Sequence, residues 1–156
     1  MTSGPVAALS VPESSRKTIY PKPFDARVEG RVKRRLGDRF SLTRFGVNLT
    51  ELAPGSVSAL LHHHTEQDEF IYVVSGNPTL VLGEQEFELR AGDCCGFKAA
   101  SGVGHQLVNT STQAVFYLEI GDRTPGDYAF YPKDDLAFGK AADGSWILTH
   151  KDGSPY

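Results

Sequence analysis

Apolar and polar residues alternate with a period of two along much of this chain. In residues 41–52, for example, Phe45, Val47 and Leu49 alternate with polar or small residues. This pattern is typical of a β-strand with one buried face. Similar short runs recur between turn residues, and the expected strands are Arg27–Leu36, Ser41–Leu52, Val57–His64, Phe70–Val74, Thr79–Leu82, Gln85–Leu89, Cys94–Phe97, His105–Asn109, Val115–Ile120, Leu136–Lys140 and Trp146–His150.

Many short strands without a long helical period favour an all-β sandwich or barrel. A double-sheet jelly roll is one such arrangement, and it leaves few open sheet edges. Residues 1–24 contain four prolines, which remove amide donors, so we expect an irregular N-terminal arm that could lie across a partner subunit. Residues 25–156 show no internal repeat, and we expect them to form a single domain.

The segment from His62 to His64 carries the strongest chemical signal. Side chains two apart in a strand share a face, so His62 and His64 should lie on one side with Cα atoms about 6.6 Å apart. Two imidazoles at this spacing can bind one metal ion through nitrogens at roughly 2.0–2.1 Å. His63 points to the opposite face and is not expected to be a ligand. Glu69 opens the next strand, and a hairpin would return its carboxylate to the two histidines.

The spacing of these residues resembles a known motif. His62-x-His64, four residues, Glu69, six residues and Gly76 together look like the first signature motif of the cupins. One departure is Gly55, which stands one residue further from His62 than is usual in that motif. The ligand positions of the motif are all filled.

A second motif of the same family follows. It consists of Gly92-Asp93, then Gly102-Val-Gly-His105, then Asn109. In the family its histidine is the fourth metal ligand, and the resemblance carries this role onto His105. The resemblance spans residues 40–121 and implies a double-stranded β-helix, the jelly-roll cupin barrel.

For the site, the resemblance implies one divalent transition metal per chain. The implied ligands are His62, His64, Glu69 and His105. Three imidazoles and one carboxylate suit zinc, iron, manganese, nickel or copper, and they leave positions open for water or substrate. The sequence shows no nucleophile–base pair, so the catalytic residues are unknown and any chemistry is expected to run through the metal.

Strand parity predicts the walls around this site. Residues two positions from an inward-pointing ligand should also point inward. A largely aliphatic wall favours a small organic ligand held by a few polar contacts. The expected pocket residues are Leu60, Ile71, Val73, Leu107 and Tyr117.

Charge is unevenly distributed along the chain. The net charge is −3, but residues 16–44 contain 10 basic and 3 acidic residues. A basic segment can indicate nucleic-acid binding, but aromatic residues are not interleaved with the charges, so we expect no nucleic-acid partner. We expect instead a solvated strand edge, or a patch that faces the acidic surface of a second subunit in a homodimer.

Two classes of function stay open. The first is a metal-dependent enzyme acting on a small oxygenated molecule or sugar derivative, by isomerase, dioxygenase or lyase chemistry. The chain resembles small bacterial cupins labelled sugar-phosphate isomerase-like. The second is a metal-assisted binding or sensor module without turnover, and a storage role is a weaker third interpretation. No apolar run approaches the ~20 residues of a membrane helix, and the adjacent Cys94 and Cys95 are expected to be reduced thiols, so we expect a cytoplasmic protein with no membrane partner.

Overall fold

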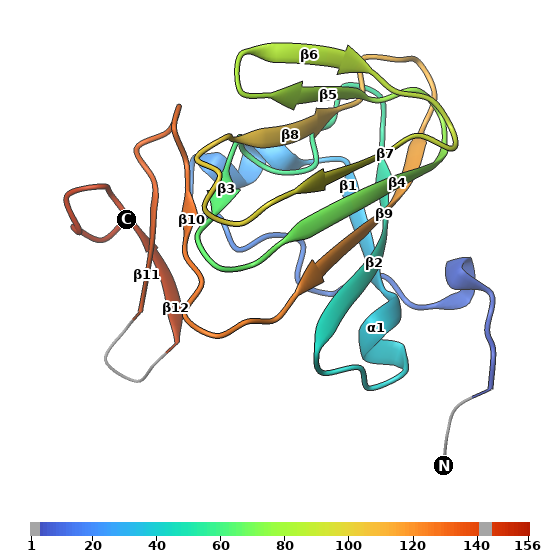
Figure 1. Cartoon of the computed structure of the whole chain (residues 1–156), viewed down its shortest axis with the longest axis horizontal. Helices are drawn as coiled ribbons and strands as arrows, with labels where there is room; N and C mark the ends of the chain where they lie inside the picture. Colours follow the sequence, from blue (N-terminus) through green and yellow to red (C-terminus); the bar gives the residue numbers. More distant parts are fainter. Residues whose placement is uncertain (1–3, 141–144) are drawn as a thin grey trace.

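The computed structural model describes residues 4–140 and 145–156, and almost all of its regular structure is β (Figure 1). The described residues include one short α-helix, α1 (Leu36–Arg39), and the 3₁₀-helices Ala8–Ser10 and Phe24–Val28. The strands are β1 (Arg31–Arg35), β2 (Phe45–Leu52), β3 (His63–His64), β4 (Glu69–Ser75), β5 (Thr79–Leu82), β6 (Gln85–Glu88), β7 (Cys94–Phe97), β8 (His105–Val108), β9 (Val115–Asp122), β10 (Ala129–Phe130), β11 (Ala137–Lys140) and β12 (Trp146–Thr149).

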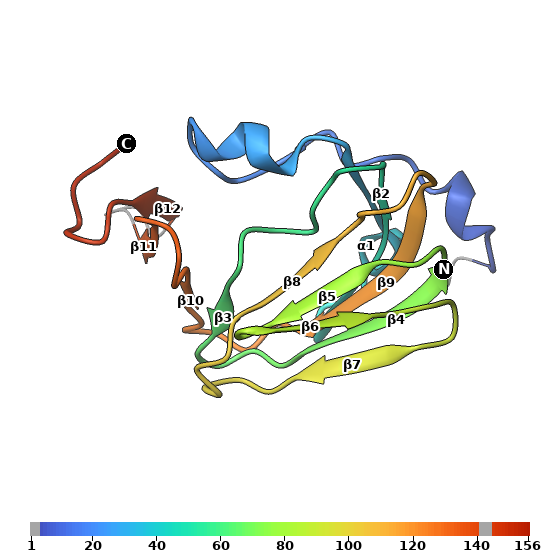
Figure 2. The ribbon, with the colours of Figure 1, turned by 90° about the horizontal axis from the view of Figure 1, so that it is seen from above.

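The strands form three antiparallel sheets. The largest has the order β1-β2-β9-β4-β7, the smallest has the order β6-β5-β8, and the third runs β12-β11-β10-β3. The hairpin of β11 and β12 stands at one end of the molecule, on the side away from the N-terminus (Figures 1 and 2). The all-β jelly roll predicted from the sequence is confirmed.

The main core fills the space between the five-stranded and three-stranded sheets. Leu52, Ile71 and Tyr117 from the larger sheet pack with Leu80 and Leu107 from the smaller one. The period-two pattern explains this packing, because residues of one parity point inward along each strand. A second core cluster lies under the N-terminal arm and consists of Tyr20, Val28, Leu60, Ala129, Tyr131 and Leu136.

One expected strand, Val57–His64, is wrong over most of its length. Only His63 and His64 form a strand, and Val57 and His62 make isolated bridges. Side chains bind the intervening backbone: the Tyr20 hydroxyl accepts from the Leu60 amide, and the Gln106 amide donates to the Ala59 carbonyl. Because these backbone groups already have partners, the segment does not need a neighbouring strand.

The N-terminal arm packs against its own chain. The Ser14 amide donates to the Lys33 carbonyl, and Glu13 bridges Arg34 on β1. The strand expected to begin at Arg27 begins only at Arg31, because a 3₁₀-helix occupies the preceding residues. The turn of the expected C-terminal hairpin, residues 141–144, lies outside the described residues. Within the described chain, no helix has the length and apolar character that crossing a bilayer requires.

Candidate metal centre

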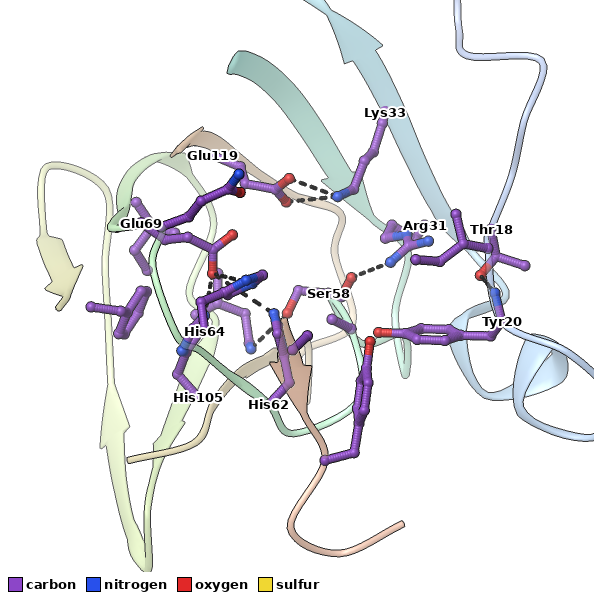
Figure 3. Close-up of a pocket in the computed structure, with 18 of the residues that line it drawn as sticks. Thr18, Tyr20, Arg31, Lys33, Ser58, His62, His64, Glu69, His105 and Glu119 are labelled. Atoms are coloured by element: carbon purple, nitrogen blue, oxygen red, sulfur yellow. Dashed lines mark hydrogen bonds and ion pairs between the residues drawn. The ribbon is translucent and has the colours of Figure 1, made fainter. Parts of the chain in front are cut away.

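Three histidine side chains point at one carboxylate oxygen (Figure 3). The Nε2 atoms of His62, His64 and His105 lie 3.7, 3.5 and 2.7 Å from Oε2 of Glu69. The donor atoms of His62, Glu69 and His105 all lie within 4.8 Å of one another. The structure therefore brings together all four residues that the sequence singled out.

Three different parts of the fold position these groups. Glu69 is the first residue of β4 and pairs with Phe97 on β7 and Gly121 on β9, rather than forming the expected hairpin with the histidine segment. His62 and His105 lie opposite each other, and each donates its amide to the other's carbonyl. The His105 ring stacks on Phe97 with the centroids 3.8 Å apart. These contacts fix the rings before any ion binds.

Two further contacts orient the imidazoles. The Nδ1 atom of His62 donates to the carbonyl of Leu60 at 2.8 Å. The Nδ1 atom of His64 lies 2.6 Å from a carboxylate oxygen of Asp127. In both rings Nε2 is then the nitrogen with a free lone pair facing the cavity, as a metal ligand requires.

Asp127 is a functional candidate that sequence reasoning missed. Its second oxygen accepts hydrogen bonds from the amides of Thr65, Glu66 and Gln67, so the carboxylate also shapes the loop after His64. Nothing in the sequence pairs it with His64, because 63 residues separate the two.

Two of the four candidate ligands, His62 and Glu69, hold the protonation state that metal binding needs. Burial, reinforced by the neighbouring His105 and His64, lowers the pKa of His62 to about 4, although Glu69 opposes this shift. Burial also opposes ionisation of Glu69, but the hydrogen bond from His105 and the charges of the histidines outweigh it and lower its pKa to about 2. At neutral pH His62 is therefore a neutral imidazole and Glu69 a carboxylate.

The donor spacing fits a single ion. Ligands bound at about 2.0–2.2 Å around one transition metal are separated from each other by roughly 3 Å. The separations from Glu69 Oε2 to the three imidazoles, 2.7 to 3.7 Å, bracket this value. His63 lies outside the group, and its ring stacks on Phe130.

The four residues line one part of a cavity of about 400 Å³. Of the expected pocket residues, Ile71, Leu107 and Tyr117 line this cavity. Leu60 and Val73 are fully buried in the protein interior and do not line it. The prediction that Leu60 points inward with His62 is wrong because the segment before His63 is not a strand, so its side chains do not alternate between two faces.

A basic wall faces the same cavity, which the interpretation of the charged segment did not include. Arg31, Lys33 and Arg35 alternate along β1 and line the cavity together with Arg16 and Lys17 of the arm. Arg31 and Lys33 are half-buried at this wall, whereas Arg16, Lys17 and Arg35 are exposed, and β1 is an edge strand of its sheet. The expected contact with a second subunit stays a prediction. The sequence contains a pattern that indicates such a wall, because Arg31, Lys33 and Arg35 alternate along one strand and so share a face.

Glu119 on β9 also lines the cavity. It accepts from Lys33 at 2.7 and 2.9 Å and from Asn48 at 3.1 Å, and the Tyr117 hydroxyl lies 3.4 Å from it. Burial opposes its ionisation, but the charge of Lys33 and these hydrogen bonds outweigh it and lower the pKa of Glu119. The cavity thus holds a carboxylate separate from the candidate metal ligands.

Comparison with known proteins agrees with this geometry. A cupin domain model matches residues 48–121, and no curated protein matches the chain. A solved structure of a sugar phosphate isomerase of the cupin superfamily, from Silicibacter pomeroyi, is 38% identical, with a TM-score of 0.90 over 98% of this chain and 96% of that one. A protein from Acidithiobacillus ferrooxidans, provisionally assigned as a sugar phosphate isomerase, is 26% identical, with a TM-score of 0.72 over 92% of this chain and 98% of that one.

A third solved structure shares the fold alone. It is the polyketide cyclase RemF from Streptomyces resistomycificus, with 21% identity and a TM-score of 0.62 over 80% of this chain and 83% of that one. The domain match covers both histidine segments and Glu69, and the 38% identical relative extends the likeness over nearly the whole chain. The chain therefore belongs to the cupin superfamily.

Proposed function

We propose that this protein is a metal-dependent cupin enzyme acting on a small oxygenated organic molecule, and that His62, His64, Glu69 and His105 hold one divalent transition metal. The observation that carries the proposal is the convergence of three imidazole nitrogens on one carboxylate oxygen in the wall of a cavity of about 400 Å³. Such a volume suits a small metabolite. A bound metal supplies a Lewis acid that polarises substrate oxygens.

Among the possible reactions, we favour isomerisation of a sugar derivative over dioxygenase or lyase chemistry. The 38% identical relative is named a sugar phosphate isomerase, which supports this choice. The cavity also contains a group that suits a polyhydroxylated molecule. The Glu119 carboxylate can accept a hydrogen bond or a proton from a substrate hydroxyl.

The metal assignment is tested by the metal content of purified protein. We expect about one zinc, iron, manganese, nickel or copper ion per chain by mass spectrometry, and we expect His62→Ala with His64→Ala to remove it. His63→Ala is the matched control, because this histidine lies between the two ligands and stacks on Phe130. Stoichiometric metal in the double variant would disprove the assignment.

Turnover separates an enzyme from a binding module. Metal-loaded protein is incubated with a set of aldose and ketose phosphates, and the mixtures are followed by NMR. Conversion that the double histidine variant lacks supports the enzyme. Saturable binding with no conversion of any member would support the sensor or carrier interpretation instead.

We also propose that the protein is a homodimer that pairs through the outer face of the five-stranded sheet. Phe70, Tyr72 and Val74 on β4 are 39–47% exposed. They lie beside the outward-facing Leu118 and Ile120 of β9, so they form one apolar face. Pairing two copies would cover this face in both.

Light scattering after size-exclusion chromatography tests the dimer. Tyr72→Lys should give monomers, because a charge would then be buried at the centre of the interface. Phe87→Lys, at an equally exposed position on β6, should leave the mass unchanged. A monomeric wild-type protein would disprove the dimer.

The location proposed for the protein is the cytoplasm. Cys94 is exposed, Cys95 is half-buried, and both are free thiols in the structure. Adjacent free thiols are compatible with a reducing compartment. Alkylation of both thiols in lysate prepared without a reductant would support this location, whereas oxidised cysteines would contradict it.

A further inference from the structure

The cavity has two chemically different sides. The candidate metal ligands lie together on one side, and Arg31 lies on the other, next to Thr18 of the arm (Figure 3). Arg31 belongs to β1, and its neighbours Arg16 and Lys17 come from the arm that folds across this part of the cavity. A ligand bound in the cavity would therefore meet the histidine cluster and a group of cations at once.

The cations of this wall differ in whether their charge is neutralised. Lys33 forms an ion pair with Glu119 at 2.7 Å, and Arg35 lies 3.6 Å from a carboxylate oxygen of Asp38. Arg31 has no carboxylate partner within the part of the chain that the structure describes. Its hydrogen bonds go to the main-chain carbonyls of Ser58 and Lys17, and neither carries a net charge.

Arg31 is also held in a fixed position. One terminal nitrogen donates to Ser58, the other donates to Lys17 at 3.0 Å, and Nε is buried without a partner among the described residues. A half-buried guanidinium with an unused donor and an unneutralised charge is costly unless an anion binds it. Because both anchoring carbonyls are already in place, little side-chain freedom would be lost on binding.

We propose that Arg31 binds the anionic group of the ligand, a phosphate or a carboxylate, while Arg16 and Lys17 add positive charge beside it. The planar guanidinium suits either oxyanion, because its parallel N–H groups match two oxygens. The inference deepens the proposed function, on which it rests for the orientation of the ligand: the anionic end lies at Arg31, and the oxygenated end lies at the histidine cluster.

The test uses metal-free protein, so that anions cannot bind to a metal. The protein carries His62→Ala with His64→Ala, and inorganic phosphate and malonate are titrated separately by calorimetry. We expect at least one of the two anions to bind, and Arg31→Gln to weaken its binding at least about tenfold. The anion that depends on Arg31 identifies the group. Undiminished binding of both anions by Arg31→Gln, or no binding of either to the parent protein, would overturn the proposal.

Arg34→Gln is the matched control, because it removes the same charge from the same strand. Arg34 pairs with Glu13 and does not line the cavity, so its loss should change binding less than twofold. Equal weakening by both variants would mean non-specific attraction and would overturn the proposal. Arg31→Lys keeps the charge without the planar fork, and we expect binding between those of the parent protein and Arg31→Gln.

A measurement on wild-type protein covers the case in which Arg31→Gln does not fold. Phenylglyoxal modifies arginines, and mass spectrometry locates the products. The anion identified by titration should slow modification of Arg31 more than that of Arg34, whereas equal protection would overturn the proposal. These results are independent of the metal: absence of a metal ion from the wild-type protein would disprove the metal centre and leave the Arg31 measurements intact.

Discussion

The two sides of the cavity are built in opposite ways. The histidine side is held by the barrel: His62 and His105 bridge each other, His105 stacks on Phe97, and Glu69 sits between two neighbouring strands. The Arg31 side is closed by the irregular arm, which is joined to β1 by a few hydrogen bonds and to the second core cluster by Tyr20. The contrast indicates a division of roles, with a rigid reactive side and a more easily opened side through which a ligand can enter.

The largest effect is expected from a substitution that disturbs the histidine side without removing a candidate metal ligand. Asp127→Asn should weaken metal affinity about 10–100-fold. The reason is that an amide NH₂ facing Nδ1 of His64 cannot accept its proton, so the ring would rotate or change tautomer. Metal affinity is measured by competition with a chromogenic chelator.

The control for this variant is Asp122→Asn. Asp122 accepts hydrogen bonds from the amides of Asp68 and Thr124 in the neighbouring loops and does not contact a histidine, so its loss should leave metal affinity unchanged. Equal affinities for Asp127→Asn and wild type would mean that the barrel alone orients His64.

A smaller effect is expected on β1, which connects the two sides. Lys33→Met leaves Glu119 buried without its cation, so we expect the free energy of unfolding at pH 7 to fall by about 2 kcal/mol. This is less than for a fully buried pair, since the Lys33 and Glu119 side chains are 27% and 20% exposed. Arg34→Met on the opposite face breaks a pair whose Glu13 is 60% exposed and should cost about 0.5 kcal/mol.

The effect of Lys33→Met on the free energy of unfolding should also depend on pH. In the wild type the pKa of Glu119 is lowered, so its stabilising contribution is present above the ordinary glutamate pKa and is lost as the pH falls through the lowered value. Without Lys33, burial should raise that pKa, so protonation on acidification relieves the penalty. The difference in unfolding free energy between wild type and Lys33→Met should therefore shrink from pH 7 to pH 4, as measured by urea denaturation. A constant difference would contradict this account.

The same contrast explains what the sequence could predict. The histidine side follows from local spacing, because His62, His64 and Glu69 lie within eight residues and their distances match a family motif. The Arg31 side depends on the arm folding back over β1. Parity places Arg31 and Lys33 on one face of a strand, but it does not say whether that face points to the cavity or to solvent.

Positions governed by side-chain contacts with backbone were also out of reach. Ser58 and Gln106 bind the backbone around Ala59 and Leu107, and so replace the strand expected before His63. Asp127 reaches His64 only after β9 and the following loop have folded against the barrel. These contacts depend on tertiary structure, and the periodicity of the sequence does not predict them.

An effect smaller than that of Lys33→Met is expected for the attachment of the arm. Tyr20→Phe removes the hydroxyl that accepts from the Leu60 amide and pairs with Tyr131, so the arm should lose about 1 kcal/mol of attachment while the barrel stays intact. Amide hydrogen exchange should become faster in the arm and at Leu60, and remain unchanged in β4 and β9. Tyr72→Phe, which removes a hydroxyl from the outer face of the five-stranded sheet, is the control. If exchange accelerated equally in the arm and in β9, the arm would unfold together with the barrel, and the contrast between a rigid and an easily opened side would not hold.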